Sequence, residues 1–216
     1  MDCALFAGMD CEEQKEMLSC LGARRMEMER GQVIFAQGDE AKRIGVVVRG
    51  AVQVCTTDYF GHRFLLAQLE EGELFGEAFV CAGAAAYPVE VTCQRSGQVL
   101  LMDYGRILSV CPRGCAHHRK LVENMITVLA AKNLRLMDRA RILSQRSTRE
   151  KLLACLSVLA RQAGSGRFVL SFTRQELADY LCVDRSAMTV ELMKLQREGK
   201  LELNGRQVTL HASQVT

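Results

Sequence analysis

The chain has 216 residues and a mass of 24.1 kDa, which exceeds one average domain of roughly 100–150 residues and predicts two modules. With 49% hydrophobic and 25% charged residues and only two prolines, it can bury a sizeable core, so a disordered chain is excluded. It has no apolar run of the ~18–20 residues that a membrane span needs and does not open on a signal peptide, which predicts a cytoplasmic protein with no membrane partner.

The net charge of +3 conceals an asymmetry between the two ends of the chain. Residues 1–140 carry 16 Lys and Arg against 18 Asp and Glu, for −2, whereas residues 141–216 carry 12 against 7, for +5. Clustered Lys and Arg neutralise phosphates and release counterions. The basic end therefore indicates either an anionic partner such as nucleic acid or an ordinary solvated surface.

The first 102 residues predict a short helix followed by β-structure. The stretch Glu12–Met28 has no proline and few β-branched residues, which suits a helix. From Gly31 to Met102, short apolar runs alternate with glycines, a pattern typical of a sandwich or barrel. Cys55 and Cys93 lie within such runs, and we expect them to be buried free thiols, as we do Cys155.

A single long helix is predicted from Ala116 to about Leu143, because this stretch contains no Gly or Pro. Such a length, about 40 Å at 1.5 Å per residue, favours a dimerisation helix over one packed only on its own domain. Its apolar repeat at steps of three and four consists of Leu121, Met125, Val128 or Leu129, Lys132 and Leu136. A hinge is expected around Asp138 to Thr148.

The C-terminal part predicts a winged helix-turn-helix. An apolar helix begins near Ser147, a β-run covers 168–171, and two helices follow at Thr173–Leu181 and from Asp184 to about Glu198. Thr173 with Glu176 forms a capping box, and Asp184 can cap the second helix. The strands 200–203 and 207–210 flank Asn204-Gly205, which favours a type I′ hairpin turn.

The start of the second helix carries side chains suited to reading base edges in the major groove. Arg185 can bond guanine, Ser186 and Thr189 can bond either base of a pair, and Val190 can meet a thymine methyl group. At the first helix, Arg174 and Gln175 beside Thr173 suit phosphate contacts. We expect Ala187, Met188, Leu192 and Leu195 to face the domain core.

Three motifs, in order, resemble the cyclic-AMP receptor and fumarate-nitrate-reduction regulator (Crp/Fnr) superfamily over essentially the full length. They are G-Q-V-I-F-A-Q-G-D at Gly31–Asp39, G-E-L-F-G-E at Gly72–Glu77 and T-R-Q-E-L-A-D-Y-L-C-V-D-R-S at Thr173–Ser186. The resemblance implies an α+β fold: a β-roll (jelly-roll, cyclic-nucleotide-binding-like) effector-sensing domain at 1–115, a dimerisation helix and hinge at 116–144, and a winged helix-turn-helix at 145–216. It also implies a homodimer on a palindromic operator in double-stranded DNA, acting with RNA polymerase. In the family, the arginine that matches Arg185 contacts bases, whereas Ser186 and Val190 depart from the cyclic-AMP receptors, so the half-site sequence is not transferred.

The resemblance further implies an effector pocket, but its phosphate-binding pair is missing. Cyclic-nucleotide pockets of the family use Gly-Glu, matched by Gly76 and Glu77, and an Arg-Ser pair ten residues further on. Tyr87 and Pro88 stand there instead, and no Lys or Arg occurs between Arg63 and Arg95, so cyclic AMP is disfavoured. Tyr87 suits a small apolar or aromatic effector, or else fills a collapsed pocket. The candidate effector residues are Gly76, Glu77, Ala78, Tyr87, Pro88, Leu121 and Met125.

Two alternatives to this function remain open. One is a metal, haem or redox sensor, because Cys111, Cys115, His117 and His118 bring four potential ligands within eight residues, although the spacing is no standard zinc signature. Cys3, Cys11 and Cys20 do not match the tighter spacing of the family's iron–sulfur branch. The other is a cyclic-nucleotide receptor with an atypical pocket. An enzyme is not expected, since no Gly-rich phosphate loop, H-E-x-x-H or nucleophile motif is present. The cofactor and the effector are unknown.

Overall fold

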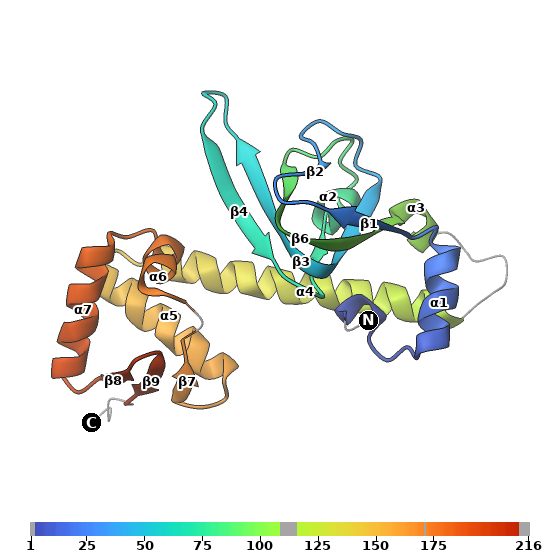
Figure 1. Ribbon diagram of the computed structural model, residues 1–216. Helices are drawn as coiled ribbons and strands as arrows, with labels where there is room; N and C mark the ends of the chain where they lie inside the picture. Colours follow the sequence, from blue (N-terminus) through green and yellow to red (C-terminus); the bar gives the residue numbers. More distant parts are fainter. Residues whose placement is uncertain (1–2, 109–115, 171, 212–216) are drawn as a thin grey trace. The chain divides into compact units, whose positions relative to one another are not determined.

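The computed structural model describes residues 3–108, 116–170 and 172–211 (Figure 1). Contacts divide the chain into two compact units, Met1–Ala130 and Ala131–Thr216. The division falls inside the long helix α4 (Ala116–Leu143), whose bounds match those expected from the sequence. The helix that we treated as a separate segment therefore contributes its first half to one unit and its second half to the other.

The first unit is built on an antiparallel sheet in which two long strands form the centre. The strands are β1 (Arg24–Met28), β2 (Val33–Phe35), β3 (Arg43–Thr57), β4 (Arg63–Leu69), β5 (Leu74–Phe75) and β6 (Glu90–Asp103). The order is β1-β6-β3-β4, with β2 also on β6 and β5 also on β3. This arrangement confirms the predicted β-roll within an α+β fold.

Apolar runs that looked like separate strands in the sequence are joined in β3 and β6. The pairing of the two strands shifts register around Arg49 and Ala51. Gly50 has a φ of 94°, and a Cβ on Gly97 would collide with the backbone of Arg49. Glycine is required at this crossing because the backbones approach more closely than side chains permit, and the resulting bulges let the long strands bend into a roll.

The predicted helix at Glu12–Met28 is wrong in its second half. Helix α1 covers Cys11–Cys20 and starts with a capping box between Asp10 and Glu13. Arg24–Met28 instead forms β1, which pairs with β6 along its whole length. Strand pairing at the sheet edge outweighs the weak helical preference of this stretch. The 3₁₀ helix η1 (Ala4–Phe6) and the short helices α2 (Glu77–Cys81) and α3 (Tyr104–Leu108) were also not predicted.

The first half of α4 completes the core of this unit. Leu121, Met125 and Val128 are buried together with side chains of the sheet. Asn124 donates hydrogen bonds to the carbonyl oxygens of Leu5 and Ala7, at 2.9 and 3.0 Å. The apolar repeat that we expected to face a second subunit is therefore, in this half of the helix, an intramolecular contact.

The second unit is a winged helix-turn-helix, as predicted. Its elements are α5 (Thr148–Gln162), β7 (Arg167–Val169), α6 (Arg174–Leu181), α7 (Arg185–Arg197), β8 (Leu201–Asn204) and β9 (Gln207–Leu210). The strands form a three-stranded sheet in the order β7-β9-β8. The core joins the three helices to the wing and includes Cys155, whose thiol pKa burial raises to about 11. Cys55 and Cys93 are also buried and free, which confirms that expectation.

The hairpin turn of the wing differs from the predicted type I′ turn. Asn204 pairs with Gln207, so the two loop residues are Gly205 and Arg206. Gly205 has a φ of 60°, and Cys182 is the sole non-glycine residue with positive φ in the described part of the chain. Positive φ at only the first loop residue is the pattern of a type II′ turn.

The end of α4 is fastened to the second unit at three points. Arg161 Nη2 donates to both carboxylate oxygens of Asp138, at 2.9 and 2.8 Å, and the guanidinium of Arg139 lies 5.3 Å from the ring centre of Tyr180. Ile142 is buried in the second core. The stretch in which we expected the hinge to begin is thus packed against the helix-turn-helix.

Across the described residues, no helix is both long and apolar enough to cross a membrane.

Candidate functional site

The start of α7 is fixed in place by local caps. Thr173 accepts a hydrogen bond from the amide of Glu176, and Asp184 accepts one from the amide of Ala187 at 2.8 Å, so both predicted caps are confirmed. Between the helices, Cys182 adopts a left-handed conformation with a φ of 51°. Such a residue ends α6 sharply and lets α7 begin three residues later, at Arg185.

One side of α7 is buried in the unit and the other faces solvent. Met188, Leu192 and Leu195 are buried, as predicted, whereas Ala187 is exposed, which corrects its assignment to the core. Ala187 lies about 100° around the helix from Met188 and lines a cleft between α7 and the start of α5, which leaves it exposed. The exposed side therefore begins at the first residue of the helix.

Ion pairs hold α7 against α5. The guanidinium of Arg149 on α5 contacts Glu198 through both terminal nitrogens, and it lies 3.7 Å from Glu191. These contacts raise the pKa of Arg149 and lower that of Glu198. Lys151 Nζ also donates to the carbonyl of Leu181 at the end of α6. The exposed face of α7 is therefore presented by a rigid support.

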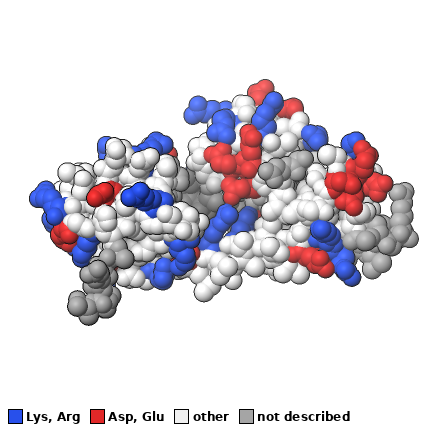
Figure 2. Space-filling view, turned by 90° about the horizontal axis from the view of Figure 1, so that it is seen from below, with Lys and Arg blue, Asp and Glu red and all other residues white. Residues whose placement is uncertain are grey.

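The four predicted base-reading residues, Arg185, Ser186, Thr189 and Val190, lie together on this exposed face. Within the described chain, the guanidinium of Arg185 takes part in no ion pair or hydrogen bond. The hydroxyl of Thr189 donates to the Arg185 carbonyl at 2.8 Å, which leaves its lone pairs available as acceptors. The second unit is on the left of Figure 2, where Lys and Arg side chains are spread over its surface with fewer Asp and Glu side chains among them.

Arg174 differs from the exposed phosphate contact that we predicted. Its side chain is half-buried, and its Nη1 atom is buried without a hydrogen-bond partner in the described structure. Gln175 is exposed but donates to Asp179 at 2.8 Å, and Thr173 uses its hydroxyl as the helix cap. A buried guanidinium nitrogen without a partner is costly, and a phosphate oxygen would satisfy it once the side chain turns outward.

Two features near α6 and α7 were missed in the sequence. Hydrogen bonds from Thr173 lower the pKa of Glu176, and the charge of Arg206 in the wing turn lowers it further. A cleft of about 550 Å³ separates the start of α5 from α7. It is lined by Ser147, Thr148, Arg149, Ala187, Val190 and Glu191. No sequence signal links α5 with α7, because their proximity is a tertiary contact.

The family's effector motif forms a tight corner at the start of α2. Gly76 has a φ of 82°, and a Cβ there would lie 3.1 Å from both Phe35 and the Arg43 carbonyl oxygen. Glycine is needed for both reasons. Glu77 follows as the first residue of α2 and is 3% exposed. The backbone of the motif is thus formed in this chain.

Tyr87 fills this corner. It is 2% exposed, and its ring stacks on Phe35 with 4.6 Å between ring centres and 4° between planes. Its hydroxyl accepts from the Arg43 amide at 3.1 Å and donates to the Arg43 carbonyl oxygen. Burial raises the pKa of the phenol. Both the ring face and the hydroxyl that we considered available to an effector are therefore engaged by the protein.

The other candidate effector residues do not converge on one cavity wall. Ala78 and Pro88 are exposed, whereas Leu121 and Met125 are buried in the core. The arginines at either end of the stretch without Lys or Arg also have partners. Arg63 lies 3.0 Å from Glu90, and Arg95 lies 2.7 Å from Glu70.

Known protein families match both the β-sheet unit and the helix-turn-helix unit of this chain. Residues 25–113 match the model of the cyclic nucleotide-binding domain, and residues 150–214 match that of the Crp-like helix-turn-helix domain. The two matches lie in the order found in one group of regulators, in which a sensor precedes a DNA-binding module. The chain belongs to the Crp/Fnr superfamily of bacterial transcription regulators.

Relatives within the Crp/Fnr superfamily are distant. The fumarate and nitrate reduction regulatory protein of Salmonella typhi is 22% identical over 207 residues, which is 94% of this chain and 80% of that protein. The transcriptional activator protein FnrL of Cereibacter sphaeroides is 26% identical over 196 residues, covering 82% and 71%. The solved structure of the c-di-GMP responsive global regulator CLP of Xanthomonas campestris is 20% identical, with a TM-score of 0.61 over 94% of this chain and 100% of that one.

As a Crp/Fnr protein, the chain is a DNA-binding transcription regulator rather than an enzyme. The Cys–His cluster considered as a metal or redox site is only partly visible. Cys111 and Cys115 lie outside the described residues, His118 is buried, and His117 Nδ1 lies 3.5 Å from a carboxylate oxygen of Glu13. Among the described residues, no group of three or more His, Cys, Asp or Glu side chains could hold a metal ion. Cys3 is buried, Cys11 is exposed and Cys20 is half-buried.

Proposed function

We propose that this Crp/Fnr regulator binds a palindromic operator as a homodimer and reads each half-site with the start of α7. The observation that carries this proposal is the exposed group Arg185, Ser186, Thr189 and Val190 on a helix held by caps and ion pairs. A guanidinium without an internal partner can bond guanine bidentately. A two-fold dimer places two such helices about one DNA turn apart, roughly 34 Å.

Contacts to the DNA backbone are assigned to the start of α6. Arg174 Nη1 has no hydrogen-bond partner among the described residues, and a phosphate oxygen would supply one. Thr173 and Gln175 flank it at the positive end of the helix dipole. These contacts fix the register of α7 on the duplex and carry no sequence information of their own.

The proposed dimer contact is the exposed side of α4. Ile126 is 62% exposed and Leu136 is 65% exposed, which is unusual for large apolar side chains on a helix. They belong to a repeat at steps of four and three, typical of a two-helix seam. The repeat consists of Val122, Ile126, Leu129, Asn133, Leu136 and Ala140, of which Val122 and Leu129 are half-buried and also pack against the core of the first unit. It replaces the seam that we first expected, whose residues Leu121 and Met125 are buried within the chain.

We infer that the sensor responds to an effector other than cyclic AMP. Tyr87 occupies the corner beside Gly76, at the position where the family's phosphate-binding arginine is expected. A cyclic phosphate buried there would lack that arginine. Since α4 contributes to both cores, a shift of this helix on effector binding would be felt at α6 and α7 and hence by RNA polymerase at the promoter. Calorimetry with cyclic AMP should show no binding at micromolar concentrations.

The proposed reading of bases is tested by selecting operator sequences from a random DNA library and measuring their binding. Arg185→Ala should weaken binding to the selected operator by about 1–3 kcal/mol and relax one base position per half-site. The matched control is Arg197→Ala, which removes the same charge from the exposed last turn of α7. It should reduce affinity for all sequences alike. Unchanged selectivity in the Arg185→Ala protein would contradict the assignment.

A further inference from the structure

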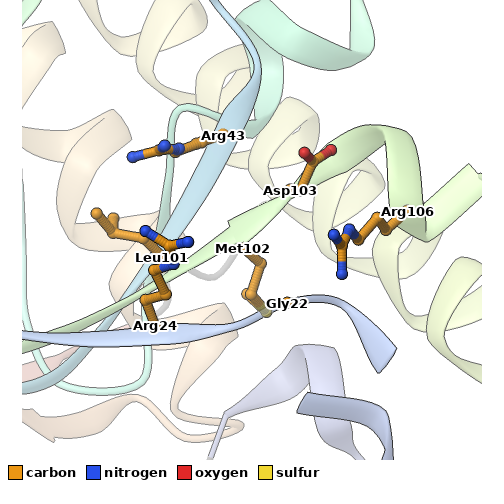
Figure 3. Close-up of a pocket in the computed structure, with 7 residues that line it drawn as sticks. All are labelled: Gly22, Arg24, Arg43, Leu101, Met102, Asp103 and Arg106. Carbon is orange, nitrogen blue, oxygen red and sulfur yellow. The ribbon is translucent and has the colours of Figure 1, made fainter. Parts of the chain in front are cut away.

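A small pocket of about 120 Å³ lies at the sheet of the first unit, and neither Glu77 nor Tyr87 lines it (Figure 3). Three arginines from three elements reach it: Arg24 from β1, Arg43 from β3 and Arg106 from α3. The rest of the lining is Gly22, Leu101, Met102 and Asp103. Neither the family motifs nor the proposed DNA contacts use any of these side chains.

Strand pairing places two of the arginines on one face of the sheet. Arg24 is paired with Leu101, and Arg43 with Asp103. Directly paired residues point to the same face, as do residues 101 and 103 of one strand. In Figure 3, Arg24 and Arg43 lie on the Leu101 side of the pocket, and Arg106 reaches back from α3 toward Met102. The three side chains therefore surround one opening from different directions.

The lining is positively charged in excess of what its one carboxylate can balance. Arg24 and Arg43 form no ion pair with any residue that the structure describes. Asp103 accepts a hydrogen bond from the Gly105 amide at 2.8 Å, which engages one of its oxygens. Arg24 and Arg43 therefore contribute two positive charges to the lining that no described carboxylate pairs with. Elsewhere on this sheet, Arg63 and Arg95 each have a carboxylate within 3.0 Å.

Gly22 shapes the remaining wall of the pocket. Its φ is +59°, and a Cβ there would come within 2.7 Å of Nη1 of Arg106 and 3.1 Å of Cζ. The positive φ favours glycine at this position, and the end of the Arg106 side chain lies directly beside it.

We propose that this pocket binds a phosphate-type oxyanion, either inorganic phosphate or the phosphate group of a small phosphorylated metabolite. Guanidinium groups present paired N–H donors that match the oxygens of a phosphate. The volume lies well below the roughly 300–1,000 Å³ that enclose a whole ligand, so the pocket takes one small anionic group. The proposal goes beyond the proposed function, because it concerns a site in the sensor unit whose lining includes neither the proposed DNA-contacting residues nor Glu77 and Tyr87.

Isothermal titration calorimetry of the full-length protein with inorganic phosphate, in a chloride buffer, tests this site. The wild type should bind phosphate saturably, and the R24Q/R43Q double variant should bind about tenfold or more weakly. The matched control is R25Q. Arg25 is the next residue of β1, points to the opposite face and donates to Gln98 at 2.9 Å, so its loss should change the affinity by less than about twofold.

Further arms separate the source of the anion from a general salt effect. The affinity for glycerol 3-phosphate is compared with the affinity for inorganic phosphate. If glycerol 3-phosphate binds at least about tenfold more tightly, the ligand is a phosphorylated metabolite, and if it binds equally or more weakly, the ligand is free phosphate. Sodium chloride at matched ionic strength should produce no saturable heat. If the double variant does not fold, the same phosphate titration is carried out with R106Q, which removes the third arginine of the pocket. Absence of saturable binding by the wild type, or equal affinity of all variants, would overturn the site, whereas the operator selection with Arg185→Ala is unaffected by that result.

Discussion

The start of α7 and the corner at Gly76–Tyr87 both follow motifs of the Crp/Fnr superfamily, yet they treat their polar groups in opposite ways. At α7, the guanidinium of Arg185 is exposed and has no partner within the described chain. At the corner, the hydroxyl of Tyr87 is hydrogen-bonded twice to Arg43, and its ring is stacked on Phe35. One region keeps its binding groups available for another molecule, whereas the other satisfies them internally.

This difference shows that backbone and side-chain features of a motif can separate. Gly76 keeps the positive φ that begins α2, and Glu77 is still buried behind it. The position expected to hold a phosphate-binding arginine carries Tyr87, which contributes packing instead of charge. A motif therefore predicts the local fold, and each side chain must then be tested for the chemistry that the family performs there.

Replacing Tyr87 is the strongest test of the idea that packing holds the corner. Tyr87→Ala should lower the free energy of unfolding by about 3–5 kcal/mol, because a buried aromatic ring leaves a cavity. Tyr87→Phe should cost about 1–2 kcal/mol, since the Arg43 amide and carbonyl lose a shared partner. Urea unfolding followed by circular dichroism measures both.

Tyr59→Ala is the matched control for Tyr87→Ala. Tyr59 is 98% exposed in the turn between β3 and β4, so its loss should change stability by less than about 0.5 kcal/mol. A Tyr87→Ala protein as stable as the Tyr59→Ala protein would contradict the packed corner and would indicate an open pocket instead.

Helix α4 shows the same contrast between its two sides. One side is buried within the chain at Leu121 and Met125, whereas the other exposes Ile126 and Leu136. Leu136→Glu should weaken self-association by about 100-fold, since the dimer contains the change twice and each lost apolar contact at a seam costs about 1–2 kcal/mol. Sedimentation velocity over a range of concentrations measures this. Ala131→Glu adds the same charge at an exposed position on the opposite side of the helix and should leave the association unchanged. Equal association of both variants would place the dimer contact elsewhere.

The turn before α7 offers a smaller effect of opposite sign. Cys182 holds a left-handed conformation that costs a non-glycine residue about 1 kcal/mol, so Cys182→Gly should stabilise the protein by about that amount. Thermal unfolding measures it. Cys11→Gly, in the first turn of α1, should destabilise instead, because glycine is a poor helix former. A loss of stability in Cys182→Gly would mean that the side chain at the turn contributes contacts that outweigh the strain.

Local patterns predicted the elements whose signals lie within the element itself. The absence of Gly and Pro between Ala116 and Leu143 gave the bounds of α4, and the side chains of Thr173 and Asp184 gave the starts of α6 and α7. The placement of Met188 and Leu195 in the core followed from helical spacing. The exposure of Arg185, Ser186, Thr189 and Val190 followed from the same spacing.

Features that depend on distant parts of the chain could not be predicted in this way. Arg24–Met28 is a strand because β6 lies beside it, and no pattern within those five residues shows the partner. The buried side of α4 was mistaken for a dimer seam because a helix can be apolar on two sides, and only the sheet decides which side it covers. The pocket around Arg106 is formed by residues of β1, β3, β6 and α3, which the sequence does not relate to one another.

Acid should distinguish the helix starts of the second unit by a small effect. The carboxylates of Glu150 and Glu176 accept hydrogen bonds from Ser147 and Thr173, and these bonds hold the pKa of each below its ordinary value of 4.5. Because each pKa is lower in the folded protein than in the unfolded chain, the stabilisation is fully present at a pH above the pKa of the unfolded chain. It is lost as the pH falls through the pKa of the folded protein. The E150Q/E176Q variant retains hydrogen-bond acceptors but cannot titrate. Its deficit in unfolding free energy relative to wild type should therefore shrink below about pH 4.5. Glu16→Gln, at an exposed position of α1, should show no such trend. A deficit of the double variant that stays constant from neutral to acid pH would exclude the two caps as the source of the pH dependence.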